Sequence, residues 1–309
     1  GRALAGRPGE APGYTLLDFF ADSVRIREKP LGHAARTRHT VCLEGDPQIL
    51  ALPCDPPPTA PDYEGRMEYV LQDSATVLTG AGCCGDMLYY GNSQGVLRAY
   101  DTRRGREVWR HRFPDALYTT PLCTDGLVIV GAASGGIWAF DARTGRRRWH
   151  LPTATAVVGD GLVDRSSLYI GLGVGSVGRI DLRSGKLFWR YDYGQGQAQG
   201  RPTLADGKLV FGAWDRHLYC LDAATGRCLW KWNNGRPGVF LSPGHVVPRI
   251  AGGKVFIVAP DRAVTCLDLA TGRQLWRDNS RKARETTGLG DDGRQFYYKT
   301  MDGELAAVD

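Results

Sequence analysis

The sequence lacks the features that assign a chain to several common functional classes. It has no run of 18 or more apolar residues, so we expect no membrane-spanning helix, and its first residues do not form a secretory leader. Its cysteines include no Cys-x-x-Cys pair, and its six histidines show no zinc-ligand spacing. No Ser/His/Asp order or nucleophile-elbow motif stands out. We therefore expect no catalytic residue and no metal site in this chain.

The composition favours short strands over helices. The chain has 41 glycines, aromatic residues make up 10% of it, and no long stretch is rich in Ala, Glu, Lys and Leu. The net charge of +6 permits an anionic partner without requiring one. The eight cysteines do not have the spacing of a disulfide framework, and a chain of 309 residues does not need one.

A repeat of about 40 residues runs through most of the chain. Five tryptophans share one phase: an aspartate lies eight positions before each of them and a glycine four positions before. These positions are Asp101, Gly105 and Trp109; Asp141, Gly145 and Trp149; Asp181, Gly185 and Trp189; Asp222, Gly226 and Trp230; and Asp268, Gly272 and Trp276. The Asp side chain accepts hydrogen bonds from the backbone beyond it, and the Gly supplies a positive φ, so each unit predicts a tight turn.

The residues around each turn predict four short antiparallel strands, A to D. Two apolar strands precede each Asp, as in LVIVG (127–131) and GIWAF (136–140), and the Trp lies on the strand that follows. Repeated four-stranded units of this length predict an all-β propeller with six to eight blades. The position two before each Asp is small, except for Arg179, which predicts close packing against a neighbouring blade. Cys220 and Cys266 occupy it and are expected to be buried and unreactive.

The Asp-x-x-Thr-Gly-x-x-x-Trp pattern resembles the tryptophan-docking motif of the quinoprotein, or PQQ-like, propeller superfamily over residues 75–309. The resemblance implies that each Trp packs between adjacent blades. WD40 repeats are not indicated, because the dipeptide Trp214-Asp215 lies outside the repeat phase. At the level of fold the chain is also similar to outer-membrane assembly lipoproteins with such propellers, although no lipobox cysteine is visible. These resemblances imply a periplasmic or secreted protein.

Two motifs resemble cofactor sites. The adjacent Cys83 and Cys84 resemble the vicinal disulfide of quinoprotein alcohol dehydrogenases, but we place them at an A-to-B turn, which is the wrong position. No segment supplies that family's calcium ligands, so we expect no PQQ and no Ca²⁺. The segment from Gly173 through Gly175 to Gly178 matches Gly-x-Gly-x-x-Gly, but no helix follows, so we interpret it as a hairpin.

The first part of the chain differs from the repeats, and we expect an N-terminal extension over 1–66 and a propeller over 67–309. Residues Gly13–Gly32 predict a β-hairpin, and a Pro-rich stretch runs from Pro53 to Pro61. The hairpin resembles the closing hairpin of bacterial calcineurin-like metallophosphoesterases, which implies an upstream catalytic domain. That family's metal motifs are absent from this sequence. A sixth blade, about 284–309, lacks strand D. Either the natural protein continues, or Met67–Asp73 completes that blade.

Two surfaces are candidates for binding. Arginines and a lysine follow the repeat Asp and predict a basic arc on the C-to-D rim, which is either solvated or in contact with an anionic partner: Arg103, Arg104, Arg106, Arg143, Arg146, Arg147, Arg148, Arg183, Lys186, Arg227 and Arg273. The long D-to-A loops at the opposite end supply candidate ligand-binding residues: Tyr193, Gln197, Arg201, Trp232, Asn233, Asn234, Arg236, His245, Arg284 and Glu285. His111 and His150 follow the strand-D tryptophans and are expected to face solvent.

The function indicated first is a non-catalytic binding or scaffolding module for a protein or glycan. Two alternatives stay open: an accessory C-terminal domain of a metallophosphoesterase, and a PQQ-dependent dehydrogenase. Specific nucleic-acid binding is not expected, because the basic residues are not interleaved with aromatic side chains.

Overall fold

The computed structural model describes residues 13–19, 23–30, 34–42, 70–235 and 237–308. The chain divides into two compact units, Gly1–Gln72 and Asp73–Asp309. The predicted boundary at residues 66–67 and the Pro-rich stretch lie outside the described residues.

The first unit contains a three-stranded antiparallel sheet. Strands β1 (Gly13–Phe19), β2 (Ser23–Pro30) and β3 (Arg36–Cys42) follow one another in that order. The pairing of β1 with β2 confirms the predicted hairpin. β3 was not anticipated; it pairs with β2 through a register shift between Ile26 and Arg27.

The second unit consists of six antiparallel sheets, which are the blades of the predicted propeller. Their A strands are β4 (Gly82–Cys84), β8 (Leu122–Thr124), β12 (Leu162–Asp164), β16 (Thr203–Ala205), β20 (Arg249–Ala251) and β24 (Ala283–Leu289). Their B strands are β5 (Met87–Gly91), β9 (Leu127–Gly131), β13 (Ser167–Gly171), β17 (Lys208–Gly212), β21 (Lys254–Val258) and β25 (Phe296–Thr300). Their C strands are β6 (Val96–Asp101), β10 (Ile137–Asp141), β14 (Ser176–Asp181), β18 (His217–Asp222), β22 (Val264–Asp268) and β26 (Leu305–Val308). The D strands are β7 (Arg106–Arg112), β11 (Arg147–Leu151), β15 (Leu187–Asp192), β19 (Cys228–Asn233) and β23 (Gln274–Asp278).

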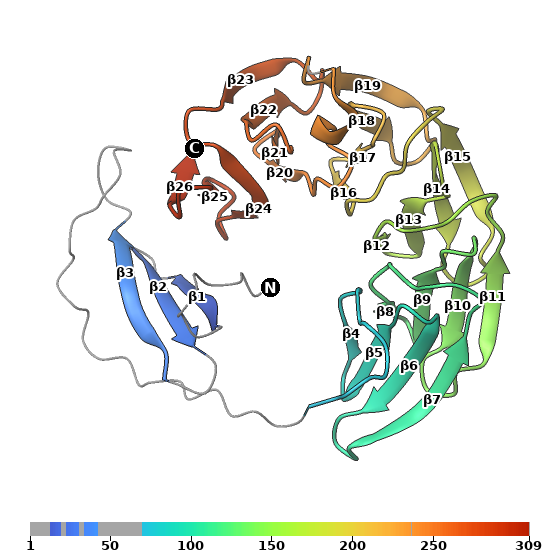
Figure 1. Ribbon diagram of the computed structural model, residues 1–309. Helices are drawn as coiled ribbons and strands as arrows, with labels where there is room; N and C mark the ends of the chain where they lie inside the picture. The colour runs from blue at the N-terminus through green and yellow to red at the C-terminus, as the bar shows by residue number, and fades with distance from the viewer. Residues whose placement is uncertain (1–12, 20–22, 31–33, 43–69, 236, 309) are drawn as a thin grey trace. The chain divides into compact units, whose positions relative to one another are not determined.

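These blades follow one another along an arc, with the A strands toward its centre and the D strands at its periphery (Figure 1). The A strands of successive blades lie side by side, as in the pairs β4 with β8 and β20 with β24. Within the described residues, five blades have four strands and the sixth has three, as the sequence predicted. One 3₁₀ turn, η1 (Val239–Leu241), lies in the loop between β19 and β20. The fold is therefore an all-β propeller of four-stranded antiparallel blades.

The conserved spacing of Asp and Gly within the repeat makes the turn between strands C and D. In the second blade, Asp141 accepts hydrogen bonds from the backbone N–H of Thr144 at 2.9 Å and from its hydroxyl at 2.8 Å. These bonds hold the pKa of the Asp141 carboxyl below its usual value. Gly145 closes the turn at φ +70°, which an L side chain rarely adopts.

The Trp of each repeat docks on the turn of the next blade. A Cβ at Gly145 would lie 2.7 Å from Cδ2 of Trp109, so the glycine is required by the neighbouring indole as well as by the turn. Each docked indole Nε1 donates to the carbonyl that follows the next repeat Asp: Trp109 to Ala142 at 2.9 Å, Trp149 to Leu182 at 2.8 Å, Trp189 to Ala223 at 3.0 Å and Trp230 to Leu269 at 2.9 Å. The predicted packing of Trp between blades is confirmed for these four.

The small residue on strand C lies directly opposite the Trp of its own blade. Ala99 pairs with Trp109, and Cys220 pairs with Trp230. Cys220 and Cys266 are buried free thiols, and burial raises the pKa of Cys220 to about 12. This confirms that they are buried core residues. The exception, Arg179, lays its guanidinium over the ring of Phe188, 4.8 Å from the centroid.

The expectation for Cys83 and Cys84 was wrong in two respects. Both lie within strand β4 and not at a turn, and Cys84 forms a disulfide with Cys123 of β8. Cys83 is an exposed free thiol. Since Cys84 and Cys123 are 39 positions apart in sequence, the bond depends on the adjacency of two blades, which spacing alone does not reveal.

The strand expected over Met67–Asp73 is also not borne out where it can be assessed. Residues 70–73 have no strand pairing, and residues 67–69 lie outside the described ranges. Asp73 instead belongs to the first blade, where its carboxylate accepts hydrogen bonds from Asn92 at 3.0 Å and from Arg98 at 2.9 Å. Because these bonds hold Asp73 beside strand β6 and the turn before it, Asp73 is part of the first blade and not of a strand in the sixth.

Candidate functional site

The candidate site lies where the segments leading into the A strands of blades four and five run side by side with strand A of blade six. Both Gln199 and Gly200 donate their backbone N–H to the carbonyl of Gly244 at 2.9 Å. A Cβ at Gly200 would lie 2.1 Å from the carbonyl oxygen of Val246, so only glycine allows this approach. The hydroxyl of Thr203 then donates to the carbonyl of Pro248 at 2.6 Å. We call the surface formed by segments 197–203, 244–249 and 285–287, together with Trp214, the inner ledge.

Trp214 is the aromatic centre of the inner ledge. It lies in the turn between β17 and β18, and its backbone N–H donates to the carbonyl of Gln197 at 3.0 Å. Its indole Nε1 donates to the side-chain oxygen of Gln199 at 3.0 Å, and its ring stacks on that of His245 with the centroids 5.4 Å apart. Gly244 packs directly against the indole. Trp214 was not a predicted site residue; its position outside the repeat phase was the available signal.

A half-buried polar network supports the turn that carries Trp214. Asp215 accepts a hydrogen bond from the hydroxyl of Tyr219 at 2.5 Å and from the backbone N–H of His217 at 3.1 Å. Tyr193 packs against Tyr219, and its hydroxyl donates to the carbonyl of Gly196 at 3.2 Å. Burial, and secondarily the charge of Asp215, raises the pKa of Tyr193 far above its usual value. Tyr193 is thus a neutral support beneath the ledge and not a surface ligand residue.

Charged groups flank the stacked rings. Nε2 of His245 lies 4.0 Å from Oε1 of Glu285, and both side chains are about one third exposed. Arg249 is half-buried at the start of β20 and donates from Nη2 to the carbonyl of Thr287 at 2.9 Å. Arg201 is exposed. The pKa of Arg249 is lowered first by its own burial and then by the positive charge of Arg201. The ledge therefore combines an aromatic stack, an amide, a carboxylate and two arginines.

The other predicted residues fall outside this cluster. Asn233 shapes its own loop, because its Nδ2 donates to the carbonyl of Arg216 at 3.0 Å and its Oδ1 accepts the N–H of Gly235 at 2.7 Å. The half-buried Trp232 lies under the guanidinium of Arg277. Arg284 is exposed on β24, one position before Glu285, and Arg236 lies outside the described residues.

Asn234 is buried and ties the loop to the next blade. Its Nδ2 donates to the carbonyl of Leu241 at 2.9 Å and to Oδ2 of Asp261 at 2.7 Å. Asp261 also pairs with Arg277 of β23. These contacts fix the loop that carries η1, so Asn234 has a structural part in the site and not a ligand-facing one.

Exposed apolar side chains lie on loops at the same end of the blades. Phe240 of η1 is 86% exposed, Val174 in the β13–β14 turn is 46% exposed, and Tyr118 in the β7–β8 loop is 44% exposed. The hydroxyl of Ser242, two residues after Phe240, donates to the carbonyl of Trp214 at 3.3 Å, which places this loop beside the ledge. Apolar groups exposed on several loops are typical of protein-binding surfaces.

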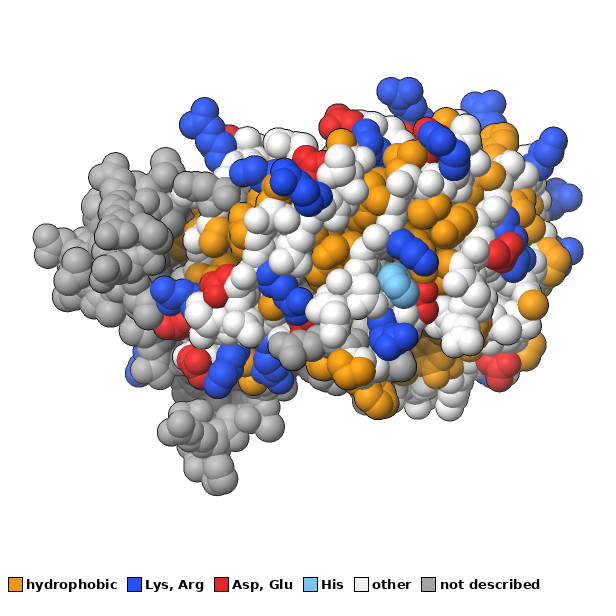
Figure 2. All heavy atoms as spheres, turned by 90° about the horizontal axis from the view of Figure 1, so that it is seen from above, with side chains coloured by type: hydrophobic (Ala, Val, Ile, Leu, Met, Phe, Trp, Pro, Cys, Tyr) orange, Lys and Arg blue, Asp and Glu red, His pale blue; other side chains and the backbone are white. Residues whose placement is uncertain are grey.

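The basic rim at the opposite end of the blades has the predicted exposure. Every one of the eleven predicted cations is exposed, and Arg106, Arg146, Lys186, Arg227 and Arg273 each directly follow a repeat glycine. Lys and Arg side chains also project from the upper and right-hand edges of the molecule in Figure 2.

The two histidines that were expected to face solvent differ from each other. His150 is exposed, but His111 packs against Phe113 and Phe140, so the expectation was wrong for His111. His111 lies two positions after Trp109 on β7 and shares its buried side.

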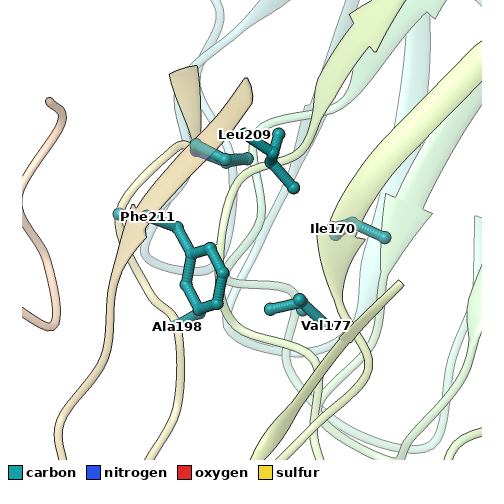
Figure 3. A pocket seen from close by; sticks show the side chains of 8 residues that line it. Ile170, Val177, Ala198, Leu209 and Phe211 are labelled. Carbon is teal, nitrogen blue, oxygen red and sulfur yellow. The ribbon is translucent and has the colours of Figure 1, made fainter. Parts of the chain in front are cut away.

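The remaining candidate sites offer no ligand chemistry. A small cavity between blades three and four is lined by Ile170, Val177, Ala198, Leu209 and Phe211, with glycines and a proline completing it (Figure 3). No side chain in that lining carries a hydrogen-bonding group. The glycine-rich segment 173–178 forms the hairpin turn after β13 and the first residues of β14, which confirms the hairpin interpretation. Among the described residues, no three His, Cys, Asp or Glu side chains gather as a metal site, and no helix is long and apolar enough to cross a membrane.

Comparisons with known proteins agree with this architecture. BamB from Moraxella catarrhalis is 18% identical, with a TM-score of 0.65 over 95% of this chain and 81% of that one. A europium-containing methanol dehydrogenase is 14% identical, with a TM-score of 0.62 over 96% of this chain and 74% of that one. The quinohemoprotein alcohol dehydrogenase ADHIIG from Pseudomonas putida HK5 is 18% identical, with a TM-score of 0.56 over 72% of this chain and 44% of that one. At these identities the likeness shows the fold alone.

No curated protein matches the sequence. The model of one protein family does match, over residues 67–171 and 173–309, and it is described as outer membrane protein assembly factor BamB. This match covers the whole repeat region and includes every docked Trp. The chain therefore belongs to the BamB family of PQQ-like β-propellers.

Proposed function

We propose that this chain is a non-catalytic propeller that binds a protein partner at the inner ledge. The observation that carries the proposal is the stack of Trp214 on His245, beside the exposed Gln199 and Arg201. An aromatic platform with polar neighbours is the usual composition of a binding hot spot. The apolar Phe240 on the adjacent loop favours a protein over a glycan. The family description, an assembly factor, supports the same function.

We also propose a periplasmic or secreted location. The Cys84–Cys123 disulfide supports it, because structural disulfides form and persist in oxidising compartments. The family description refers to the outer membrane, which is consistent with that location.

A PQQ-dependent dehydrogenase is the second candidate, favoured by the likeness to quinoprotein dehydrogenases. The residues present do not fit that cofactor well. The vicinal disulfide that the resemblance implies does not form, because Cys84 is bonded to Cys123 and Cys83 is free. Titration with PQQ and Ca²⁺ tests this candidate, and we expect no saturable change in the PQQ spectrum. A near-stoichiometric change would favour the dehydrogenase over the binding module.

The binding function is tested by photo-crosslinking in cells that make the natural protein. A photoreactive phenylalanine analogue replaces Phe240, which is 86% exposed beside the ledge; the matched control carries it at Phe188, 49% exposed on the outer strand β15. We expect a discrete adduct from position 240, whose partner is identified by mass spectrometry, and none from position 188. The adduct should weaken when Trp214→Ala is added. Equal labelling from both positions, or no loss with Trp214→Ala, would contradict the proposal.

A further inference from the structure

Arg201 and Arg249 are two cations on the inner ledge that no carboxylate of the described residues neutralises. Arg249 is half-buried, and its guanidinium donates only to neutral groups: Nη2 to the carbonyl of Thr287 at 2.9 Å and Nε to the hydroxyl of Thr287 at 3.4 Å. Among the described residues, neither arginine has a carboxylate oxygen within 4.0 Å.

Two other half-buried arginines of the propeller are neutralised by carboxylates, and a third, Arg179, lies over the rings of Tyr169 and Phe188. Arg98 pairs with Asp73 at 2.9 Å and with Glu107 at 2.6 Å, and Arg277 pairs with Asp261. A partly desolvated guanidinium without a counter-ion is unfavourable, so such groups are ordinarily paired. Among the described residues, Arg249 has neither a carboxylate nor an aromatic ring as partner and therefore keeps an unmet capacity to bind an anion.

The fold holds the segments that carry the two arginines side by side. The hydrogen bond from Thr203 to Pro248 keeps the segment carrying Arg201 beside the segment carrying Arg249. Burial, followed by the charge of Arg201, lowers the pKa of Arg249, so the two charges lie close enough to repel each other. Arg201 itself is exposed. An anion that binds the exposed Arg201 would therefore also be attracted by the charge of Arg249.

We propose that Arg201 and Arg249 bind the carboxylate of an acidic side chain in the protein partner. This inference rests on the proposed function and names the chemistry that the ledge recognises. A guanidinium fork matches the two oxygens of a carboxylate. Glu285, 4.0 Å from His245 on the same ledge, disfavours a doubly charged phosphate more strongly than a singly charged carboxylate. The stacked rings of Trp214 and His245 provide an adjacent flat surface for the residues next to the acidic side chain.

The test is an NMR titration of the full chain labelled with ¹⁵N-arginine, at low ionic strength, following the Nε–Hε signals. The probes are the blocked tripeptide Gly-Glu-Gly, its Gly-Gln-Gly counterpart and inorganic phosphate. Arg201→Gln and Arg249→Gln assign the two signals, and the exposed rim residue Arg227 is the internal control. This readout detects millimolar binding and does not require the partner to be known.

We expect saturable shifts of the Arg201 and Arg249 signals with the Glu peptide and a linear, smaller response at Arg227. Arg201→Gln should weaken the response of Arg249 by about tenfold, the loss expected for one charge-assisted contact. Equal responses to the Glu and Gln peptides, an equal response at Arg227, or tighter binding of phosphate would each overturn the inference. If cross-linking at position 240 succeeds while these signals stay unmoved, the binding function stands and only the acidic ligand is wrong.

Discussion

The disulfide between the first two blades gives the sharpest stability prediction. Cys84 of β4 and Cys123 of β8 close a loop with a sequence separation of 39. The loop-entropy relation gives a change of about 13 cal/mol/K for a loop of this length, or about 3.9 kcal/mol at 25 °C. Since engineered and native disulfides often deliver less than this relation states, we expect the double variant Cys84→Ser/Cys123→Ser to lose about 2–4 kcal/mol.

The assay is urea unfolding under oxidising conditions, with the free energy of unfolding taken from the midpoint and slope. Reduction of the unmutated protein should reproduce the loss of the double variant. Cys83→Ser is the matched control: this thiol is exposed and free, so its replacement should change stability by less than about 0.5 kcal/mol. The reasoning is refuted if the double variant is as stable as the unmutated protein, or if Cys83→Ser is as costly.

Three further predictions concern the repeat and pH. Trp149→Phe should lower the free energy of unfolding by about 1–3 kcal/mol, measured by thermal or urea unfolding, because it removes the indole donor at a blade boundary. Trp138→Phe should cost less, because its buried indole Nε1 has no hydrogen-bond partner among the described residues, and equal losses would contradict the docking account. Gly185→Ala should lower the free energy of unfolding by about 1–3 kcal/mol more than Gly207→Ala does. Both glycines have φ near +70°, but only a Cβ at position 185 would meet Trp149, at 2.6 Å. Equal losses for the two variants would argue against this contact. Burial, and then a nearby arginine, lowers the pKa of His111, so its contribution to stability is complete above pH ~6.5 and is lost as pH falls through the folded value. The urea midpoint should thus drop between pH 7.5 and 5.5, and His111→Phe should flatten that drop.

The fold was predictable because the repeat encodes it locally. Asp141 and Gly145 define a turn through contacts within five residues, and the same positions recur in every repeat. The alternating apolar strands between the turns, such as LVIVG, then fix the four-stranded unit. The docking of Trp109 on the next blade followed from the family resemblance, and the structure adds that Gly145 is the surface on which it docks.

The candidate site was only partly predictable, because it depends on contacts between blades. Arg201 and His245 were singled out from their long loops, but Trp214 was passed over because it is outside the repeat phase. Its stack on His245 joins residues 31 positions apart in different blades, a contact that sequence spacing does not encode. The Cys84–Cys123 bond was missed for the same reason.

The central claim is that the inner ledge, and not the basic rim, contacts the partner. Hydrogen exchange of the full chain tests it directly, measured with and without the partner identified by cross-linking at Phe240. We predict slower exchange at segments 197–203, 244–249 and 285–287, with the rim turns around Gly145, Gly185 and Gly226 unchanged. Protection confined to the rim turns, or no protection at the ledge, would contradict the account.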